Sequence, residues 1–148
     1  MEVFVSPELE QKLIDKYPKL FTHSGGARSS SPAALGFECD DGWFDLIDIL
    51  SAQLSELDPI DEGDGVHSIR AVQVKEKYGT LRFYVGAATN EATALIDFAE
   101  ALSARICETC GNRGRAYGTA WLKTLCDSCA RQQGYTSAGV KDLKLAKP

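Results

Sequence analysis

The chain has 148 residues, 44% of them hydrophobic, and a formal net charge of −5. This length and apolar content suit one compact domain with a small appendage, and they exclude a chain that is disordered throughout. No apolar run approaches the roughly 20 residues needed to span a bilayer, and the first residues lack the basic start and apolar core of a secretory signal. We therefore expect a cytoplasmic protein without a membrane segment.

The first predicted helix starts at Ser6, because Ser6 suits an N-cap, Pro7 suits the first helical position, and acidic residues follow in the first turn. The helix should end near Pro18. Its apolar face consists of Leu9, Leu13, Ile14 and Tyr17. The stretch 23–32 contains two adjacent glycines and three consecutive serines, which predicts an exposed, mobile loop.

A second helix is predicted after Asp40 or Asp41, either of which suits an N-cap. It should end before Asp58 and Pro59. Its apolar stripe, at steps of four and three, consists of Trp43, Ile47, Leu50, Leu54 and Leu57. Cys39, just before this helix, has no cysteine or histidine close to it in sequence, and we expect a buried, inert thiol there.

Two antiparallel strands are predicted over 69–74 and 80–85, with Gly79 as the turn residue. The acidic, glycine-containing stretch 61–65 before them lacks the ligand spacing of an EF-hand, so an exposed turn is expected.

A third helix should begin at Asn90 as its cap. Its expected apolar face consists of Leu95, Phe98 or Ala99, Leu102 and Ile106. Because this helix leads directly into Cys107, we expect whatever follows to be docked on it rather than tethered by a linker.

Two C-x-x-C pairs dominate the rest of the chain. Fifteen residues separate the first pair from the second, and the ligands are Cys107, Cys110, Cys126 and Cys129. Two matched pairs at this spacing favour one tetrahedral Zn²⁺ with four thiolates over a redox motif or two disulfides. Since catalytic zinc normally keeps a ligand position open, a closed set of four cysteines predicts a structural ion.

The residues around the pairs predict a zinc ribbon or treble clef. Gly111 suits the tight turn after the first pair, and Gly118 suits the turn of a hairpin over 115–125. A helix should follow from Cys126 to Gln133. The predicted fold class is therefore α+β, with helices packed on a small antiparallel hairpin. The predicted parts are an acidic body at 1–105, a docked zinc module at 106–135 and a basic tail at 136–148 with the composition of a disordered segment.

Charge is unevenly distributed along the chain. Residues 1–103 hold eight basic and eighteen acidic side chains, a net of −10, whereas residues 104–148 hold eight basic and three acidic, a net of +5. There is no lysine or arginine between Arg28 and Arg70, although ten acidic residues lie there. We therefore expect a charge dipole with a strongly negative body.

Asp41, Asp45 and Asp48 stand at steps of four and three, which places them on one face of the predicted second helix. They suit a solvated outer face, a surface that binds a basic partner together with Glu38 and Asp40, or catalytic or metal-binding carboxylates. A pocket that gathered Glu38, Asp41, Glu76 and Arg82 would favour the enzyme.

The basic end permits a nucleic-acid interpretation. Arg113, Arg115, Lys123 and Arg131 are interleaved with Tyr117 and Trp121, a pattern suited to phosphates and exposed bases. The alternative is that the two aromatic side chains fill the small core of the zinc module while the cations are solvated or pair with the body.

Four segments, 36–47, 74–84, 106–111 and 121–126, resemble a family of small uncharacterised proteins of bacteria and their phages. The shared pattern is FECxDGW, KEKYGTLRFY, CExCG and TLCxxC, and it covers most of residues 36–130, including the four cysteine ligands. The resemblance implies the context of a phage or mobile element and no particular activity.

Charge and resemblance together predict a non-enzymatic zinc-binding protein whose acidic face binds and inhibits a basic, nucleic-acid-handling host protein, such as a defence component. A zinc-finger regulator that binds DNA or RNA, and a small enzyme with a carboxylate site, are the alternatives. The sequence does not indicate an oligomeric state.

Overall fold

The computed structural model describes residues 5–21, 37–61 and 63–135, and the fold is α+β. The predicted mobile loop at 23–32 and basic tail at 136–148 lie outside these residues. The elements are α1 (Pro7–Lys16), β1 (Phe37–Glu38), the 3₁₀ helix η2 (Asp41–Trp43), α2 (Phe44–Ser55), β2 (Ile60–Asp61), β3 (Val66–His67), β4 (Ala71–Lys77), β5 (Thr80–Val85), α3 (Asn90–Ser103), β6 (Arg115–Tyr117), β7 (Lys123–Leu125) and α4 (Asp127–Gln132). No helix within the described ranges combines the length and hydropathy needed to cross a membrane.

The main sheet has the order β1-β4-β5. The predicted hairpin is confirmed: β4 and β5 are antiparallel, and Tyr78 and Gly79 turn the chain with φ values of 54° and 78°. Two positive φ values in a two-residue loop match the right-handed twist of the flanking strands. The sequence did not indicate β1, which pairs parallel with β4, nor the β2–β3 pair, because two-residue strands carry no periodicity.

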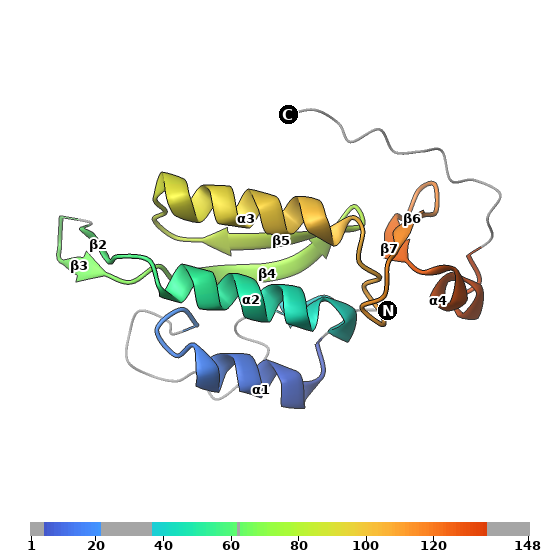
Figure 1. The fold of residues 1–148 in the computed structure, drawn as a ribbon, viewed down its shortest axis with the longest axis horizontal. Helices are drawn as coiled ribbons and strands as arrows, with labels where there is room; N and C mark the ends of the chain where they lie inside the picture. The colour runs from blue at the N-terminus through green and yellow to red at the C-terminus, as the bar shows by residue number, and fades with distance from the viewer. Residues whose placement is uncertain (1–4, 22–36, 62, 136–148) are drawn as a thin grey trace.

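One face of this sheet holds the core. Val74 and Phe83 are paired across β4 and β5 and both are buried. Phe83 and Phe37 pack around Phe21, with ring centroids 6.4 Å and 5.2 Å from it. Lys75 pairs with Arg82 on the opposite face. Figure 1 shows α2 and α3 side by side next to the β4–β5 hairpin, with α1 next to α2 and residues 106–135, the C-terminal module, at one end.

The outer edge of β5 is covered by α3. The Leu81 N–H donates to Ser103 Oγ at 2.8 Å, and the Phe83 N–H donates to Glu100 Oε1 at 2.9 Å. Because β5 is the last strand of the sheet, these N–H groups would otherwise lack a partner or offer a template to another chain.

The predicted face of α3 is partly wrong. The buried side chains are those of Ala92, Ile96, Ala99 and Ser103, and Leu95 is half-buried. Phe98 is 69% exposed and Leu102 is 37% exposed. Small side chains at 92, 99 and 103 let the helix approach the sheet closely, which a stripe of large residues would prevent. The helix is capped by Thr89, which accepts from the Ala92 N–H, and not by Asn90.

The predicted apolar stripe of α2 is confirmed, since Trp43, Ile47, Leu50 and Leu54 are buried and Leu57 packs against the core. The predicted cap is wrong. Neither Asp40 nor Asp41 caps the helix with its side chain, because η2 precedes α2. Asp41 instead accepts a hydrogen bond from the Ser6 N–H at 2.7 Å, at the start of α1.

The C-terminal module packs on the body through hydrogen bonds to backbone carbonyls. The Gly42 N–H donates to the Glu108 carbonyl at 2.7 Å, and Trp43 Nε1 donates to the Ile106 carbonyl at 2.9 Å. On the other side, Thr124 Oγ1 donates to the Gly79 carbonyl at 2.6 Å. These contacts join η2 and the hairpin turn of the body to the module.

Replacing Gly42 with alanine should lower the free energy of unfolding by about 2 kcal/mol, since a Cβ there would collide with the carbonyl oxygens of Cys107 and Glu108. Thermal and denaturant unfolding would measure the loss. Gly86→Ala is the matched control, because nothing lies within 4 Å of the Cβ it would add. Equal stability of the two variants would contradict the tight contact at Gly42.

Candidate metal centre

Four cysteine sulfurs form a cluster that fits one metal ion. The Sγ atoms of Cys107, Cys110, Cys126 and Cys129 all lie within 4.8 Å of one another, and those of Cys110 and Cys126 are 3.6 Å apart. Sulfurs at the corners of a tetrahedron around Zn²⁺ would be about 3.8 Å apart, given a Zn–S bond of about 2.3 Å. The predicted ligand set is thus brought together, and its donor chemistry suits zinc.

Local backbone structure places the first ligand pair in a tight turn. The Gly111 N–H donates to the Cys107 carbonyl at 2.9 Å, and Gly111 has the predicted positive φ, 79°. The Cys107 N–H donates to the Asn112 carbonyl at 2.7 Å. Such a turn aims both sulfurs of the pair at one point.

The second ligand pair starts α4. Cys126 is the N-cap, and its Sγ accepts a hydrogen bond from the Cys129 N–H at 3.4 Å. The β6–β7 hairpin lies between the two pairs and turns at Gly118, with φ 98°. A turn, a hairpin and a helix that carries the second pair occur in the order of a treble clef, so the predicted α+β fold with a four-cysteine module is confirmed.

The four thiols differ in their readiness to ionise. The hydrogen bond from the Cys129 N–H lowers the pKa of Cys126 to about 7. Burial raises the pKa of Cys110 and of Cys129 above the ordinary thiol value. A bound ion must therefore displace protons from these sulfurs, and its affinity should fall in acid.

Glu108, between the two ligands of the first pair, is only 1% exposed. Its Oε1 accepts from the Asp40 N–H at 3.2 Å, while its Oε2 has no hydrogen-bond partner. Burial raises the pKa of Glu108 to about 7, and the nearby Lys123 acts in the opposite direction. Sequence reasoning missed this residue because a glutamate between two cysteines gives no sign of burial.

Cys39 lies in the core and is fully buried, as predicted. Burial raises the pKa of its thiol far above the ordinary range, so the thiolate does not form readily. Cys39 is not a member of the four-sulfur cluster.

The acidic residues proposed for partner binding do not share one free helical face. Asp41 lies in η2 and is bonded to the Ser6 N–H. Asp48 accepts from Lys16 Nζ at 2.9 Å and from the Tyr17 hydroxyl at 2.7 Å. Although burial acts against ionisation, these two hydrogen bonds hold the pKa of Asp48 below its ordinary value. The sequence spacing of these acids could not show that α1 packs beside α2 and bonds Asp48.

The other three acids differ from one another. Asp40 is half-buried and accepts from Thr109 Oγ1 at 3.4 Å. Glu38 lies on β1, exposed, beside Lys75 in the parallel register. Asp45 is exposed on α2. Of the five predicted residues, Asp45 and Glu38 therefore remain most open to a partner.

The predicted cations of the C-terminal module are also unequal. The Arg115 guanidinium bonds Asp127 at 3.2 Å and lies over the Tyr117 ring, 4.8 Å from its centroid. Arg113 and Arg131 are exposed, and Lys123 is partly exposed. Arg115 thus serves the internal structure of the module.

The two aromatic side chains take different positions. Tyr117 is buried in the module, and its hydroxyl bonds Asp127. Trp121 is 72% exposed. The expectation that both rings fill the small core therefore holds for Tyr117 and is wrong for Trp121.

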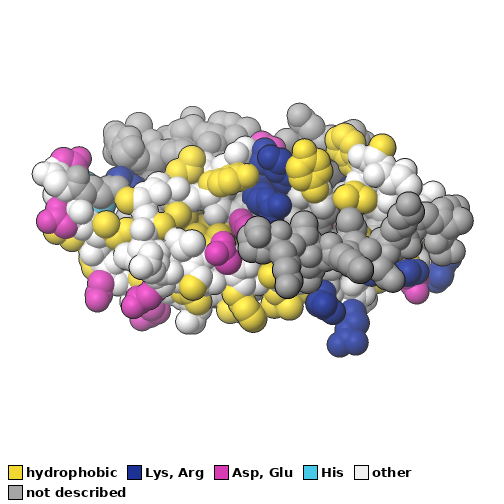
Figure 2. All heavy atoms as spheres, turned by 90° about the horizontal axis from the view of Figure 1, so that it is seen from above, with side chains coloured by type: hydrophobic (Ala, Val, Ile, Leu, Met, Phe, Trp, Pro, Cys, Tyr) yellow, Lys and Arg dark blue, Asp and Glu magenta, His cyan; other side chains and the backbone are white. Residues whose placement is uncertain are grey.

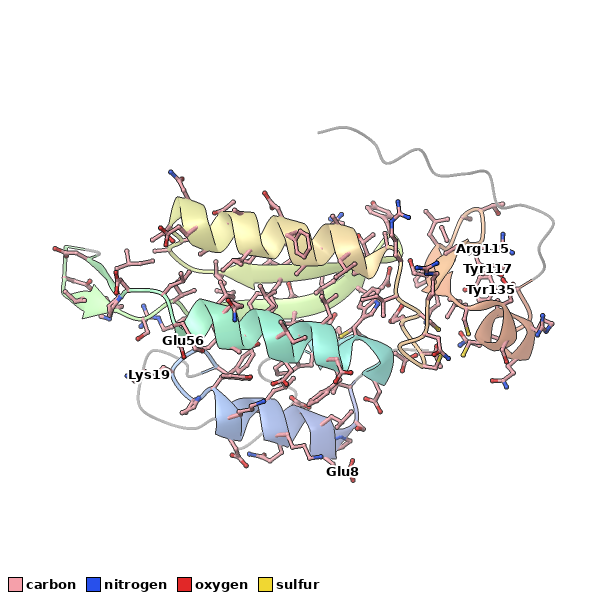
Figure 3. The ribbon with its side chains drawn as sticks, viewed as in Figure 1. Glu8, Lys19, Glu56, Arg115, Tyr117 and Tyr135 are labelled. Atoms are coloured by element: carbon pink, nitrogen blue, oxygen red, sulfur yellow. The ribbon has the colours of Figure 1, made fainter. Side chains whose placement is uncertain are left out.

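An open depression of about 520 Å³ lies beside the helix of the module. Arg115, Tyr117 and Tyr135 lie close together there, as Figure 3 shows. The remaining lining residues are Asp127, Ala130, Arg131 and Gly134. Asp127 offsets one of the two arginines, so the depression has no strong preference for anions.

The residues named for an enzyme site are spread over separate contacts. Glu76 accepts from the Gly79 N–H at 2.7 Å, whereas Arg82 lies 3.6 Å from Glu100. In the β4–β5 register Glu76 pairs with Leu81 and Lys75 pairs with Arg82, so Glu76 and Arg82 project from opposite faces of the sheet.

Comparison of the chain with protein-family models, with curated proteins and with solved structures finds no match.

Purified protein should contain one zinc ion per chain, and Cys126→Ala should lose it, because three sulfurs cannot close the tetrahedron. Elemental analysis would measure the metal. Its content should also fall below neutral pH, as protons compete for the thiolates.

Cys39→Ala is the matched control for this experiment and should keep the metal, since Cys39 lies outside the cluster. Full metal content in Cys126→Ala would place the ion elsewhere in the molecule.

Proposed function

We propose that this protein is a non-enzymatic recognition protein, in which a structural zinc ion holds the C-terminal module and the acidic body binds a basic partner. Four thiolates leave a zinc ion no open position for substrate, which supports a structural role for the ion. The carboxylates named for a catalytic site lie in separate contacts, and this also favours recognition over catalysis.

One observation carries the proposal: a long stretch of the body presents carboxylates without a cation of its own. The sequence from 29 to 69 contains no lysine or arginine. The exposed acidic residues of its described part are Glu38, Asp41, Asp45, Glu56, Asp58, Asp61 and Asp64. Figure 2 shows acidic side chains gathered at the end of the molecule where the β2–β3 arm lies, and basic ones toward the centre and the other end.

Such a distribution steers a basic partner toward the acidic body and repels nucleic acid from it. A basic groove that handles nucleic acid has the complementary charge. The resemblance to phage and bacterial proteins supports the more specific proposal of an accessory protein that occupies such a groove on a host protein and inhibits it.

Charge reversal at Asp45 should weaken the binding to a basic partner several-fold, because Asp45 is one of the exposed carboxylates and takes no part in the hydrogen bonds described between α1 and α2. The Asp45→Lys protein would be immobilised beside wild type, and basic proteins retained from a bacterial lysate would be quantified by mass spectrometry. Retention by wild type should fall as salt rises from about 50 to 300 mM, since surface charge pairs are screened.

Asp97→Lys is the matched control, because Asp97 is also an exposed helical carboxylate but lies on α3. Equal retention of the same basic proteins by both variants would contradict an acidic binding face on α2. Asp41→Asn and Asp48→Asn are less suitable as tests, since both carboxylates take part in internal hydrogen bonds and their loss would also alter the contacts with α1.

The exposure of Trp121 favours a second candidate, binding of single-stranded nucleic acid by the C-terminal module. Tyr78, which is also exposed, precedes Gly79, and the Gly79 carbonyl accepts a hydrogen bond from Thr124, three residues after Trp121. Exposed aromatic rings stack on bases, and Lys77 adjoins Tyr78 while Lys123 lies two residues after Trp121. The charge of the module gives this candidate less support. Residues 104–135 carry five basic and two acidic side chains, a net of +3. Four thiolates around a divalent ion reduce this to about +1, which is a weak attraction for phosphates.

Tryptophan fluorescence tests this candidate directly. Of the two tryptophans, Trp43 is fully buried and Trp121 is exposed, so stacking on a base should quench only Trp121. Titration with a single-stranded oligothymidine should lower the emission of wild type and leave that of Trp121→Phe unchanged. Absence of quenching at low salt with both DNA and RNA oligomers would exclude stacking at Trp121.

A further inference from the structure

The outward face of α3 presents a stripe of apolar side chains to solvent. Phe98 is 69% exposed and Leu102 is 37% exposed. Ile49, on the neighbouring helix α2, is 63% exposed. Single exposed apolar residues are ordinary, but Phe98 and Leu102 stand four residues apart and are therefore neighbours on the surface of one helix, which indicates an interaction site.

The positions of the stripe follow a helical seam. Counted from Phe98, the residues at steps of three, four and seven in each direction lie on one face of the helix or, for the last of them, in the turn that follows it. They are Glu91, Ala94, Leu95, Phe98, Ala101, Leu102 and Arg105. All are exposed except Leu95, which is half-buried. Five apolar residues thus lie between an acidic one at the first turn of α3 and a basic one in the turn that ends it.

Two copies of this seam complement each other when the two helices run antiparallel. In an antiparallel pair of α3 helices centred on Phe98, Glu91 of one chain meets Arg105 of the other. Ala94 then meets Leu102, so that a small residue faces a large one, and Phe98 meets its own copy on the axis. A twofold axis repeats every contact, as an isologous interface requires. The antiparallel arrangement also pairs opposite ends of the two helix dipoles.

We propose that α3 forms the interface of a homodimer, in which two copies of the helix pack antiparallel about a twofold axis at Phe98. The charge complementarity of Glu91 and Arg105 and the match of small to large residues select a second copy of this chain as the occupant. The proposed dimer does not depend on the acidic face described above.

The dimer should be weak. A helix of 14 residues is about 21 Å long, and its seam with Ile49 offers less area than the roughly 800 Å² per partner of a standard interface. Like net charge on the two chains adds repulsion at low salt. We therefore expect a dissociation constant in the micromolar range.

Cysteine crosslinking tests the register. In the proposed pair, residue 94 of one chain meets residue 102 of the other, whereas two copies of residue 94 lie about 12 Å apart along the axis. A mixture of zinc-loaded Ala94→Cys and Leu102→Cys proteins should form a disulfide-linked dimer under mild oxidation. Each variant alone, and wild type, should remain monomeric on a non-reducing gel. Failure of the mixture to crosslink, or equal crosslinking of either variant alone, would overturn this register.

Sedimentation of wild type from 10 to 500 µM should show a reversible monomer–dimer equilibrium, and Phe98→Asp should remain monomeric. Because Phe98 is exposed in the monomer, this substitution should keep the melting temperature close to that of dilute wild type. A wild type that stays monomeric at 500 µM would overturn the proposal.

Charge reversal distinguishes the antiparallel dimer from other apolar association. Glu91→Arg and Arg105→Glu should each weaken dimerisation about two- to fivefold at low salt, since each places like charges together. The double variant should recover the wild-type dissociation constant, because the pair re-forms with exchanged partners. A double variant weaker than either single one would contradict the pairing of these residues.

Discussion

The close backbone contact between Gly42 and the first cysteine turn is the constraint on which the rest of the arrangement depends. It requires a residue without a side chain at 42, and the hydrogen bond from Gly42 to Glu108 fixes the distance between η2 and the turn. Trp43 next to it lies in the body core and bonds the Ile106 carbonyl, so the same few residues belong to both parts. This contact joins residues 42 and 108, which lie far apart in the sequence, and the Thr124 hydrogen bond to Gly79 makes a second link between module and body.

Strong local patterns were enough to predict several elements. The proline and acids after Ser6 gave α1, the alternation of Leu81 and Phe83 gave β5, and the cysteine spacing gave the metal centre. Elements that depend on distant partners were not predictable. β1 is a strand only because β4 lies beside it, and the buried face of α3 is set by how closely small residues let it approach β5. The sequence of α3 contains two overlapping apolar stripes, and it does not indicate which of them the sheet buries.

Charge in this protein has two roles that sequence spacing alone does not separate. Asp48 pairs with Lys16, and Arg115 pairs with Asp127, so these charges take part in contacts within the fold. Asp45 lies on α2 three residues before Asp48 but is exposed, and Glu38 is exposed on β1. The proposed recognition therefore rests on the carboxylates that the fold leaves unpaired, and the total charge of the body overstates what a partner would meet.

The way in which α3 closes the sheet restricts how any partner can recognise this protein. Ser103 and Glu100 occupy the amide groups that point outward from β5, so a foreign peptide cannot lengthen the sheet along that border. A partner protein must instead recognise the shape and charge of exposed side chains. In the proposed twofold dimer the α3 interface is closed, and the covered edge of β5 offers no N–H groups at Leu81 and Phe83 for further strand pairing.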